Sequence, residues 1–194
     1  MRMICLFATL ALLSACGSGV KDGGVTDKRL DDAASETQNW LTYGGTYEEQ
    51  RYSGLTALTA DTVGGLGLEW AHEFDTARGL EATPLVADGV IYTTTAWSKV
   101  HALDAVTGKL LWSYDPKVPG ETGFKACCDV VNRGAALYDG KVYVGTLDGR
   151  LIALDAKTGR LVWSVVTVDQ TKPYTITGAP RIVKGPRPDR QWRR

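Results

Sequence analysis

Short apolar segments separated by turn residues occupy much of the second half of the chain. The turn pairs Asp139-Gly140, Asp148-Gly149 and Thr158-Gly159 recur at intervals of about nine or ten residues. The segments between them alternate apolar and polar residues or run apolar, with many β-branched side chains. This pattern is typical of an antiparallel β-meander. The four predicted strands are 133–138, 141–147, 150–155 and 160–166.

The same pattern occurs earlier in the chain, and the two copies align without a gap at an offset of 51 residues. Both contain Ala-Leu-Asp-Ala-x-Thr-Gly-x-Leu-x-Trp, which ends at Trp112 in the first copy and at Trp163 in the second. A four-stranded unit repeated every ~40–50 residues is typical of a β-propeller blade. We expect both tryptophans to pack between blades, on turns shaped by the Asp and Thr-Gly of the motif. Tryptophans in an ordinary core would fit nearly as well.

A third copy begins at Ala179-Pro180, which resembles the earlier blade opening at Thr83-Pro84. The next residues should form an apolar strand, but the sequence from Pro186 to Arg194 contains two prolines and four arginines. Such a segment cannot continue a central strand. We interpret residues 185–194 as an aberrant basic tail at a truncated or frame-shifted end, although phosphate binding is an alternative.

Composition is that of a soluble globular protein, with 44% hydrophobic residues and 22 basic against 22 acidic side chains. This balance gives no reason to expect a nucleic-acid partner. The N-terminus differs, because Arg2 precedes an apolar run over residues 4–13. That run is shorter than the ~20 residues needed to span a bilayer, but it fits a secretory signal.

The signal ends in Leu13-Ser14-Ala15-Cys16, which resembles the bacterial lipobox. We therefore predict a signal peptide over residues 1–16 and a lipid on Cys16; an ordinary signal cut nearby is the alternative. Residues 17–36 are small and polar, which favours a flexible linker before propeller repeats at 37–184. We expect the protein in the periplasm. We expect its anchor to lie in the outer membrane, because Gly17 is not an acidic retention signal.

Export places the cysteines in an oxidising compartment, where disulfides persist. Cys5 leaves with the signal and Cys16 would carry the lipid, so Cys127 and Cys128 remain. They can bond to each other, to another molecule, or not at all. A bond between neighbours closes an eight-membered ring, with Cα atoms about 3.8 Å apart instead of the usual ~4.4–6.8 Å.

From about Trp40 to Lys184 the sequence resembles the alcohol dehydrogenases that depend on pyrroloquinoline quinone (PQQ). The motifs that carry the resemblance are Tyr43-Gly44-Gly45-Thr46-Tyr47, Gln50-Arg51-Tyr52-Ser53, Glu81-Ala82-Thr83-Pro84, Cys127-Cys128-Asp129-Val130-Val131-Asn132-Arg133-Gly134 and Thr175-Ile176-Thr177-Gly178-Ala179-Pro180. The tryptophan repeat is weakly specific, whereas the cysteine pair followed by Asn-Arg-Gly is highly specific. The resemblance implies an all-β, eight-bladed propeller, of which about three blades are present.

Glu81, Arg133 and Thr177 stand at or just before the first strand of their repeats, and those strands line the channel of a propeller. We therefore expect three blades to direct these side chains at one axial site. PQQ is a flat tricarboxylated quinone, so Arg133 can bind a carboxylate or quinone oxygen, Thr177 can donate its hydroxyl, and Glu81 can accept from a ring N–H or orient a donor. The resemblance further implies that a Cys127–Cys128 disulfide lies against one face of the quinone. Without the family, a surface ion pair and ordinary strand-end residues would be the simpler interpretation.

In the family a Ca²⁺ or lanthanide ion acts as Lewis acid, a carboxylate takes the alcohol's proton, and a tryptophan covers the other face of PQQ. The resemblance places these groups beyond this chain. We therefore expect the N-terminal part of a periplasmic dehydrogenase that passes electrons from alcohols to a periplasmic acceptor, inactive alone. The alternative is a non-enzymatic propeller lipoprotein that assists outer-membrane assembly; it has no need of Cys127-Cys128 with Arg133.

Overall fold

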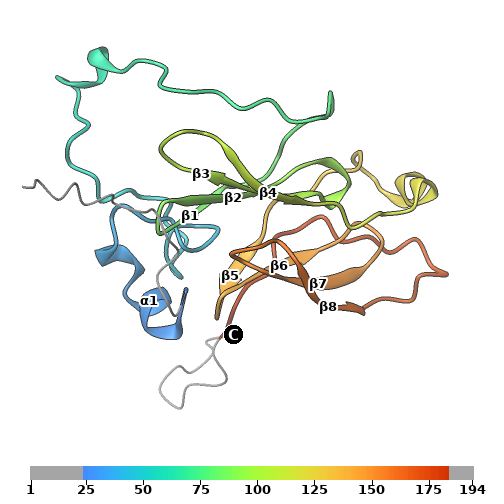
Figure 1. The fold of residues 1–194 in the computed structure, drawn as a ribbon. Coiled ribbons are helices and arrows are strands. Elements are labelled where there is room, and N and C mark those ends of the chain that lie inside the picture. The colour runs from blue at the N-terminus through green and yellow to red at the C-terminus, as the bar shows by residue number, and fades with distance from the viewer. Residues whose placement is uncertain (1–23, 184–194) are drawn as a thin grey trace, which may run out of the picture.

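A computed structural model of the protein describes residues 24–183 and contains two four-stranded antiparallel sheets, one above the other (Figure 1). The strand orders are β1-β2-β3-β4 and β5-β6-β7-β8, with each strand paired to its neighbour in sequence. The first sheet comprises β1 (Leu85–Ala87), β2 (Val90–Thr94), β3 (Val100–Asp104) and β4 (Leu110–Tyr114). The second comprises β5 (Ala136–Tyr138), β6 (Lys141–Gly145), β7 (Arg150–Asp155) and β8 (Leu161–Val166).

The predicted four-stranded meander is confirmed, with differences at strand ends: β6 ends at Gly145 and not at residue 147, β8 begins at Leu161 and not at residue 160, and the largest difference is at the start. β5 begins at Ala136, whereas the sequence pattern placed the strand from residue 133. The reason is that the backbone of Arg133 bonds to other repeats: its N–H donates to Thr177 (2.9 Å), and its carbonyl accepts from Thr83 (3.3 Å). Residues before β5 thus link three repeats instead of extending one sheet.

The sequence repeat is also a structural repeat, down to an irregularity in the ladder. The register shifts between Ala102 and Leu103 in the first sheet and between Ala153 and Leu154 in the second. The turn that follows is built on an aspartate in both. In the second copy the Asp155 carboxylate accepts from the N–H (2.8 Å) and hydroxyl (2.7 Å) of Thr158, and these bonds hold the Asp155 pKa below its ordinary value.

Trp112 lies between the two sheets, as predicted. Its indole N–H donates to the carbonyl of Ala156 (3.0 Å), and its ring lies where a side chain at Gly159 would have to be. Trp70 occupies the same place above Gly108. The sequence interpretation did not include Trp70, although the spacing of Leu68 and Trp70 repeats that of Leu110 and Trp112.

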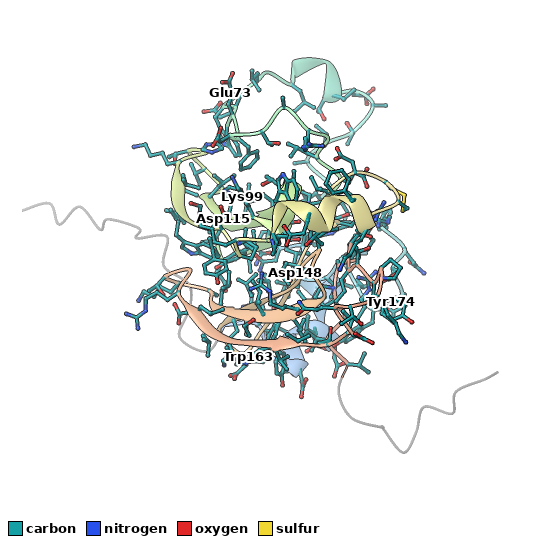
Figure 2. All side chains as sticks on the ribbon, turned by 90° about the vertical axis from the view of Figure 1, so that its right-hand side faces the viewer. Glu73, Lys99, Asp115, Asp148, Trp163 and Tyr174 are labelled. Atoms are coloured by element: carbon teal, nitrogen blue, oxygen red, sulfur yellow. A yellow bond between two sulfur atoms is a disulfide. The ribbon has the colours of Figure 1, made fainter. Side chains whose placement is uncertain are left out.

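Trp163 is the next tryptophan of this series and lies on β8, at the lower edge of Figure 2. Every residue of β8 is exposed, and Trp163 is 38% exposed although it packs on Tyr143 of its own sheet. Its packing against a neighbouring blade stays a prediction. The strand β8 therefore presents several apolar side chains to solvent.

The larger of two hydrophobic clusters within residues 24–183 joins the two sheets. Its fully buried side chains include Leu85, Tyr92, Val100, Val142, Val144, Ile152 and Leu154. Burying an aliphatic side chain of this size is worth about 1.5–3 kcal/mol. The core therefore fixes the two sheets relative to each other, and with them the segments that precede β1 and β5.

Residues 24–36 do not form the flexible linker expected from their composition. They contain α1 (Asp27–Asp31) and the 3₁₀ helix η1 (Ala33–Ser35), and they bury Val25, Leu30 and Ala33 in the core. Arg29 secures the segment by bonds to Glu36 (2.6 and 2.8 Å) and to Asp88 (2.9 Å) at the β1–β2 turn. Few apolar residues were enough because Val25, Leu30 and Ala33 are all buried.

Three further 3₁₀ helices, η2 (Val63–Gly65), η3 (Ala96–Ser98) and η4 (Gly120–Lys125), lie in connections. The connection that holds η2 extends above the first sheet in Figure 1. None of the helices within residues 24–183 is long and apolar enough to cross a membrane. The predicted signal peptide, the lipidation site Cys16 and the basic tail at 185–194 lie outside the described residues.

Candidate functional site

The openings of three repeats lie side by side next to the sheets. The backbone of Arg133 is bonded to Thr83 on one side and to Thr177 on the other. Gly134 permits this close approach, because it has a φ of +127° and a Cβ there would lie 3.2 Å from the carbonyl oxygen of Thr83. The sequence prediction that these segments converge is therefore confirmed by the backbone geometry.

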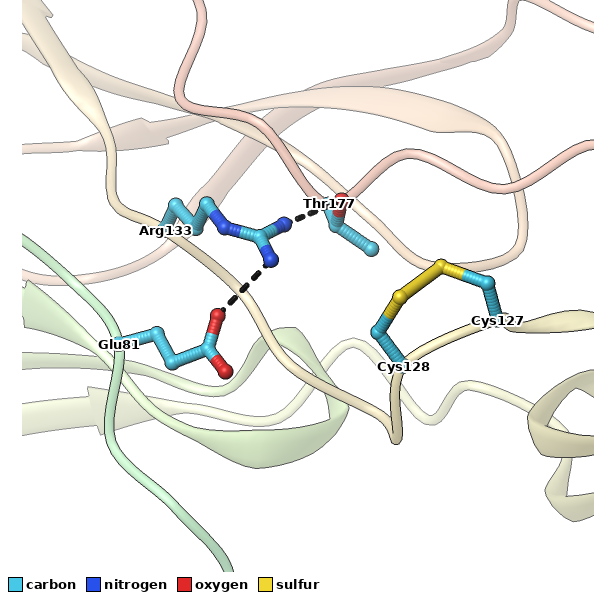
Figure 3. The surroundings of a disulfide bond; sticks show 5 residues. All are labelled: Glu81, Cys127, Cys128, Arg133 and Thr177. Carbon is cyan, nitrogen blue, oxygen red and sulfur yellow. Dashed lines mark hydrogen bonds and ion pairs between the residues drawn. A yellow bond between two sulfur atoms is a disulfide. The ribbon is translucent and has the colours of Figure 1, made fainter.

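Arg133 lies between the other two predicted site residues and contacts both (Figure 3). Its Nη1 donates to the hydroxyl of Thr177 (2.8 Å), and its Nη2 forms an ion pair with the Glu81 carboxylate (2.9 Å). The side chains of Arg133 and Glu81 are 38% and 42% exposed. A guanidinium has five N–H donors, so Arg133 can bind an external anion while it keeps these two contacts.

Asn132 holds the backbone beside Arg133 and was given no role by the sequence interpretation. It is 1% exposed, and its amide donates to the Gly145 carbonyl (2.8 Å) and to Ser98. Its side-chain oxygen accepts from the hydroxyl of Thr94 (2.8 Å) and the N–H of Gly134 (3.0 Å). A buried amide with all its bonds made fixes both sheets to the segment that carries Arg133. The available signal was an asparagine directly after the apolar pair Val130-Val131.

Cys127 and Cys128 are joined by a disulfide, with Cα atoms 3.8 Å apart. The sequence alone left free thiols and intermolecular bonds open. Both residues are exposed, and they follow Ala126, the C-cap residue of η4. In the view of Figure 3 the sulfur atoms point from their turn toward Arg133 and Thr177. The five predicted cofactor-binding residues therefore form one neighbourhood.

The turn that carries the disulfide contacts two connections of the first sheet, the one that contains Arg78 and the one that contains Trp97. The Asp129 carboxylate forms an ion pair with Arg78, whose guanidinium lies 5.9 Å from the centre of the Trp97 ring. The N–H of Trp97 donates to the carbonyl of Val130 (2.9 Å). Sequence reasoning missed this group, because Arg78 lies outside the repeat and 51 positions from Asp129.

Comparison with known proteins identifies the family. Residues 40–168 match the family described as PQQ, the glucose/ethanol/alcohol dehydrogenase beta-propeller domain. The chain belongs to this PQQ-dependent alcohol dehydrogenase family. The predicted β-propeller fold is confirmed with it: two blades are complete within residues 24–183, and the segments around Trp70 and Thr177 pack against them as parts of neighbouring repeats.

Two relatives illustrate the match. The dehydrogenase subunit of the quinone alcohol dehydrogenase of Komagataeibacter europaeus is 56% identical over 184 residues, which cover 90% of this chain and 25% of that protein. The solved quinohemoprotein alcohol dehydrogenase ADHIIG of Pseudomonas putida HK5 is 54% identical with a TM-score of 0.81, over 83% of this chain and 24% of that one. The chain thus spans about a quarter of the length of the relatives it matches.

A solved europium-containing methanol dehydrogenase is more distant, at 38% identity and a TM-score of 0.77, over 81% of this chain and 28% of that one. Within residues 24–183 of the present chain, no group of three or more His, Cys, Asp or Glu side chains is placed to hold a metal ion. The side chains around Arg133 suit an organic anion instead, because they combine an exposed cation, a hydroxyl and a carboxylate next to an exposed disulfide.

Proposed function

We propose that the residues around Arg133 bind PQQ, in a longer protein that oxidises alcohols. The observation that carries the proposal is the half-exposed Arg133, held between Glu81 and Thr177 beside the Cys127–Cys128 disulfide. Membership of the PQQ family supports it. When bound, PQQ supplies a quinone that accepts the two electrons removed from an alcohol.

Each of the predicted site residues has a separate role in this proposal. Arg133 bonds a carboxylate or quinone oxygen of the cofactor, and Glu81 keeps the guanidinium oriented through their ion pair. Thr177 accepts from Arg133, so its hydroxyl hydrogen is free to point toward a ligand oxygen. The disulfide provides a firm, weakly polar surface for one face of a flat ring system.

The test is a titration of the 194-residue chain with PQQ, followed by quenching of tryptophan fluorescence. Replacing Arg133→Ala should weaken binding by about ten- to a hundredfold, because a hydrogen bond to a charged group contributes about 1.5–3 kcal/mol and 1.4 kcal/mol is tenfold. Arg160→Ala, on the exposed turn before β8, is the control and should leave binding unchanged. Equal affinity of the wild type and the Arg133→Ala chain would contradict the proposal, as would an absence of binding.

The substrate and the acceptor belong to the longer protein. Printed names of relatives include a 1-butanol dehydrogenase (cytochrome c) of Thauera butanivorans, which is 57% identical over 147 residues and matches 75% of this chain and 21% of that protein. By analogy we propose a primary alcohol as substrate and a periplasmic electron acceptor such as a cytochrome c. A Ca²⁺ or lanthanide ion would complete the cofactor site in the longer protein, as europium is present in the methanol dehydrogenase.

We also propose export to the periplasm and attachment to the outer membrane through a lipid on Cys16. The support is the lipobox-like Leu13-Ser14-Ala15-Cys16 after a short apolar run. Metabolic labelling with a fatty acid should mark the wild-type chain, and Cys16→Ala should abolish the label. Label that survives this substitution would remove Cys16 from consideration. The scaffold-lipoprotein alternative shares this anchor, but the family match does not favour it.

A further inference from the structure

The disulfide turn is held in place from outside the PQQ motif. Asp129 follows Cys128 directly, and its carboxylate pairs with Arg78, in the connection between η2 and β1. Both side chains are nearly half exposed, so this ion pair alone makes a small contribution. The guanidinium also lies over the Trp97 ring, at 5.9 Å from its centre, and this cation–π contact adds to the ion pair.

Trp97 is a fixed support for this arrangement. Its backbone N–H donates to Val130, two residues after the disulfide, and Val130 is buried against Ala96 and Leu147. A side chain at Gly123 would meet the Trp97 ring at 3.3 Å, so the ring also borders η4. The disulfide thus lies between two segments, before and after it, that both rest on Trp97.

The backbone of Asp129 is in an unfavourable conformation, which it should leave if the contact with Arg78 is lost. Its φ is +65°, in the left-handed region that residues other than glycine adopt at an energetic cost, which is smaller for aspartate than for most residues. In the observed turn the Arg78 contact offsets that cost. Without Arg78, the turn gains access to other backbone conformations that present the two sulfur atoms differently.

We propose that Arg78 is a positioning residue, which holds the Cys127–Cys128 turn through Asp129 in the shape that presents the disulfide beside Arg133. The significance of that shape for PQQ rests on the proposed function. The proposal that Arg78 fixes the turn is independent of that function, and it can be tested without any cofactor.

The measurable consequence is the equilibrium between disulfide and dithiol. Reduction by dithiothreitol delivers two electrons and two protons to Cys127 and Cys128, and dithiothreitol leaves as its cyclic disulfide. A turn held by Arg78 keeps the two thiols where they can re-form the bond, whereas a released turn lets them separate. Loss of Arg78 should therefore shift the equilibrium toward the dithiol.

The experiment incubates the 194-residue chain in dithiothreitol buffers of graded redox ratio, alkylates free thiols, and quantifies the peptide with Cys127 and Cys128 by mass spectrometry. Arg78→Gln should raise the equilibrium constant for reduction about three- to thirtyfold, from the two contact energies together. Arg181→Gln is the matched control, because Arg181 also pairs with a carboxylate (Glu49, 2.6 Å) and lies over a ring (Tyr43, 4.4 Å). It shares no contact with the turn.

A second variant, Asp129→Asn, removes the ion pair but leaves Arg78 free to lie over Trp97, and it should shift the equilibrium in the same direction by less. The exchange of both residues, Arg78→Asp with Asp129→Arg, should recover part of the wild-type value. An unchanged equilibrium in Arg78→Gln, or an equal shift in Arg181→Gln, would overturn the inference. PQQ titration of the same proteins separates the two proposals. Failure of the wild type to bind PQQ would contradict the proposed cofactor site, whereas the role of Arg78 is decided by the redox equilibrium alone.

Discussion

His101 is a residue whose protonation opposes folding. It lies on β3 with its Nε2 bonded to the hydroxyl of Thr95 (3.1 Å) and its ring 4.7 Å from that of Phe74. Burial, with the nearby His72 and Lys99, lowers the pKa of His101 from 6.5 to about 4. The unfolded chain therefore takes up this proton at a higher pH than the folded chain does.

The folding stability should consequently be complete above pH 6.5 and fall as the pH drops from 6.5 to 4. Because the imidazole is partly exposed, we expect about 1–2 kcal/mol of this loss to come from His101 after solvent screening. Urea unfolding at pH 7.5 and pH 4.5 measures it. His101→Gln should flatten the dependence, whereas His72→Gln should retain most of it because burial is the main cause. An equal pH dependence in the wild type and His101→Gln would show that another group is responsible.

Sequence reasoning succeeded for residues that the repeat places and failed for those it does not. Glu81, Arg133 and Thr177 each stand at or just before the first strand of successive repeats, so the propeller geometry brings them together before any contact is known. Arg78 lies in an irregular connection, and its meeting with Asp129 depends on a path that no periodicity describes. Asn132 was visible as a polar residue in an apolar run, but its partners come from both sheets.

At the level of elements, the two tryptophans of the repeat provide an internal comparison. Trp112 is bonded to Ala156 and covers Gly159 of the next sheet, whereas Trp163, at the equivalent position of β8, is 38% exposed. Trp112→Ala should lower the free energy of unfolding by about 3 kcal/mol, the lower end of the usual cost of removing a buried aromatic side chain, because Trp112 is partly buried. Trp163→Ala should cost about 1 kcal/mol or less, since surface substitutions have small effects. Chemical denaturation of the two variants measures both; equal losses would mean that Trp163 is covered in solution.

Strands were easier to predict than the short helices. The strand limits follow from Asp-Gly and Thr-Gly turns, whose conformation is set by local chemistry. The five residues of α1 are too few to show a helical period, and isolated helices of that length are unstable in water. α1 exists because Leu30 is buried and Arg29 is bonded to Asp88, and both are tertiary contacts that composition cannot reveal.

For the whole molecule, the exposed surface of β8 bears on activity. A propeller blade is stabilised by both neighbours, and here the last complete sheet presents its outer strand to solvent. In the proposed site, the described residues would contact PQQ from one side only, through Arg133 and its partners. We therefore expect the 194-residue chain alone to bind PQQ weakly and to oxidise no alcohol.

Dye-linked oxidation of a primary alcohol, with PQQ and either Ca²⁺ or a lanthanide added, is the measurement. The protein-free mixture is the control for dye reduction by PQQ itself. Turnover above that control would mean that copies of the chain complete the propeller together, or that the catalytic groups lie elsewhere in it.

The burial of Val25 and α1 also limits the distance between the propeller repeats and Cys16. The structure describes the chain from Gly24 onward, and seven residues of the sequence stand between Cys16 and Gly24. Fully extended, that segment reaches about 28 Å, compared with about 70 Å for the twenty-residue linker suggested by composition. If Cys16 carries the proposed lipid, Gly24 would thus stay within about 28 Å of the anchored residue. Redox partners that diffuse along the membrane surface would then meet the protein more often than those in the bulk periplasm.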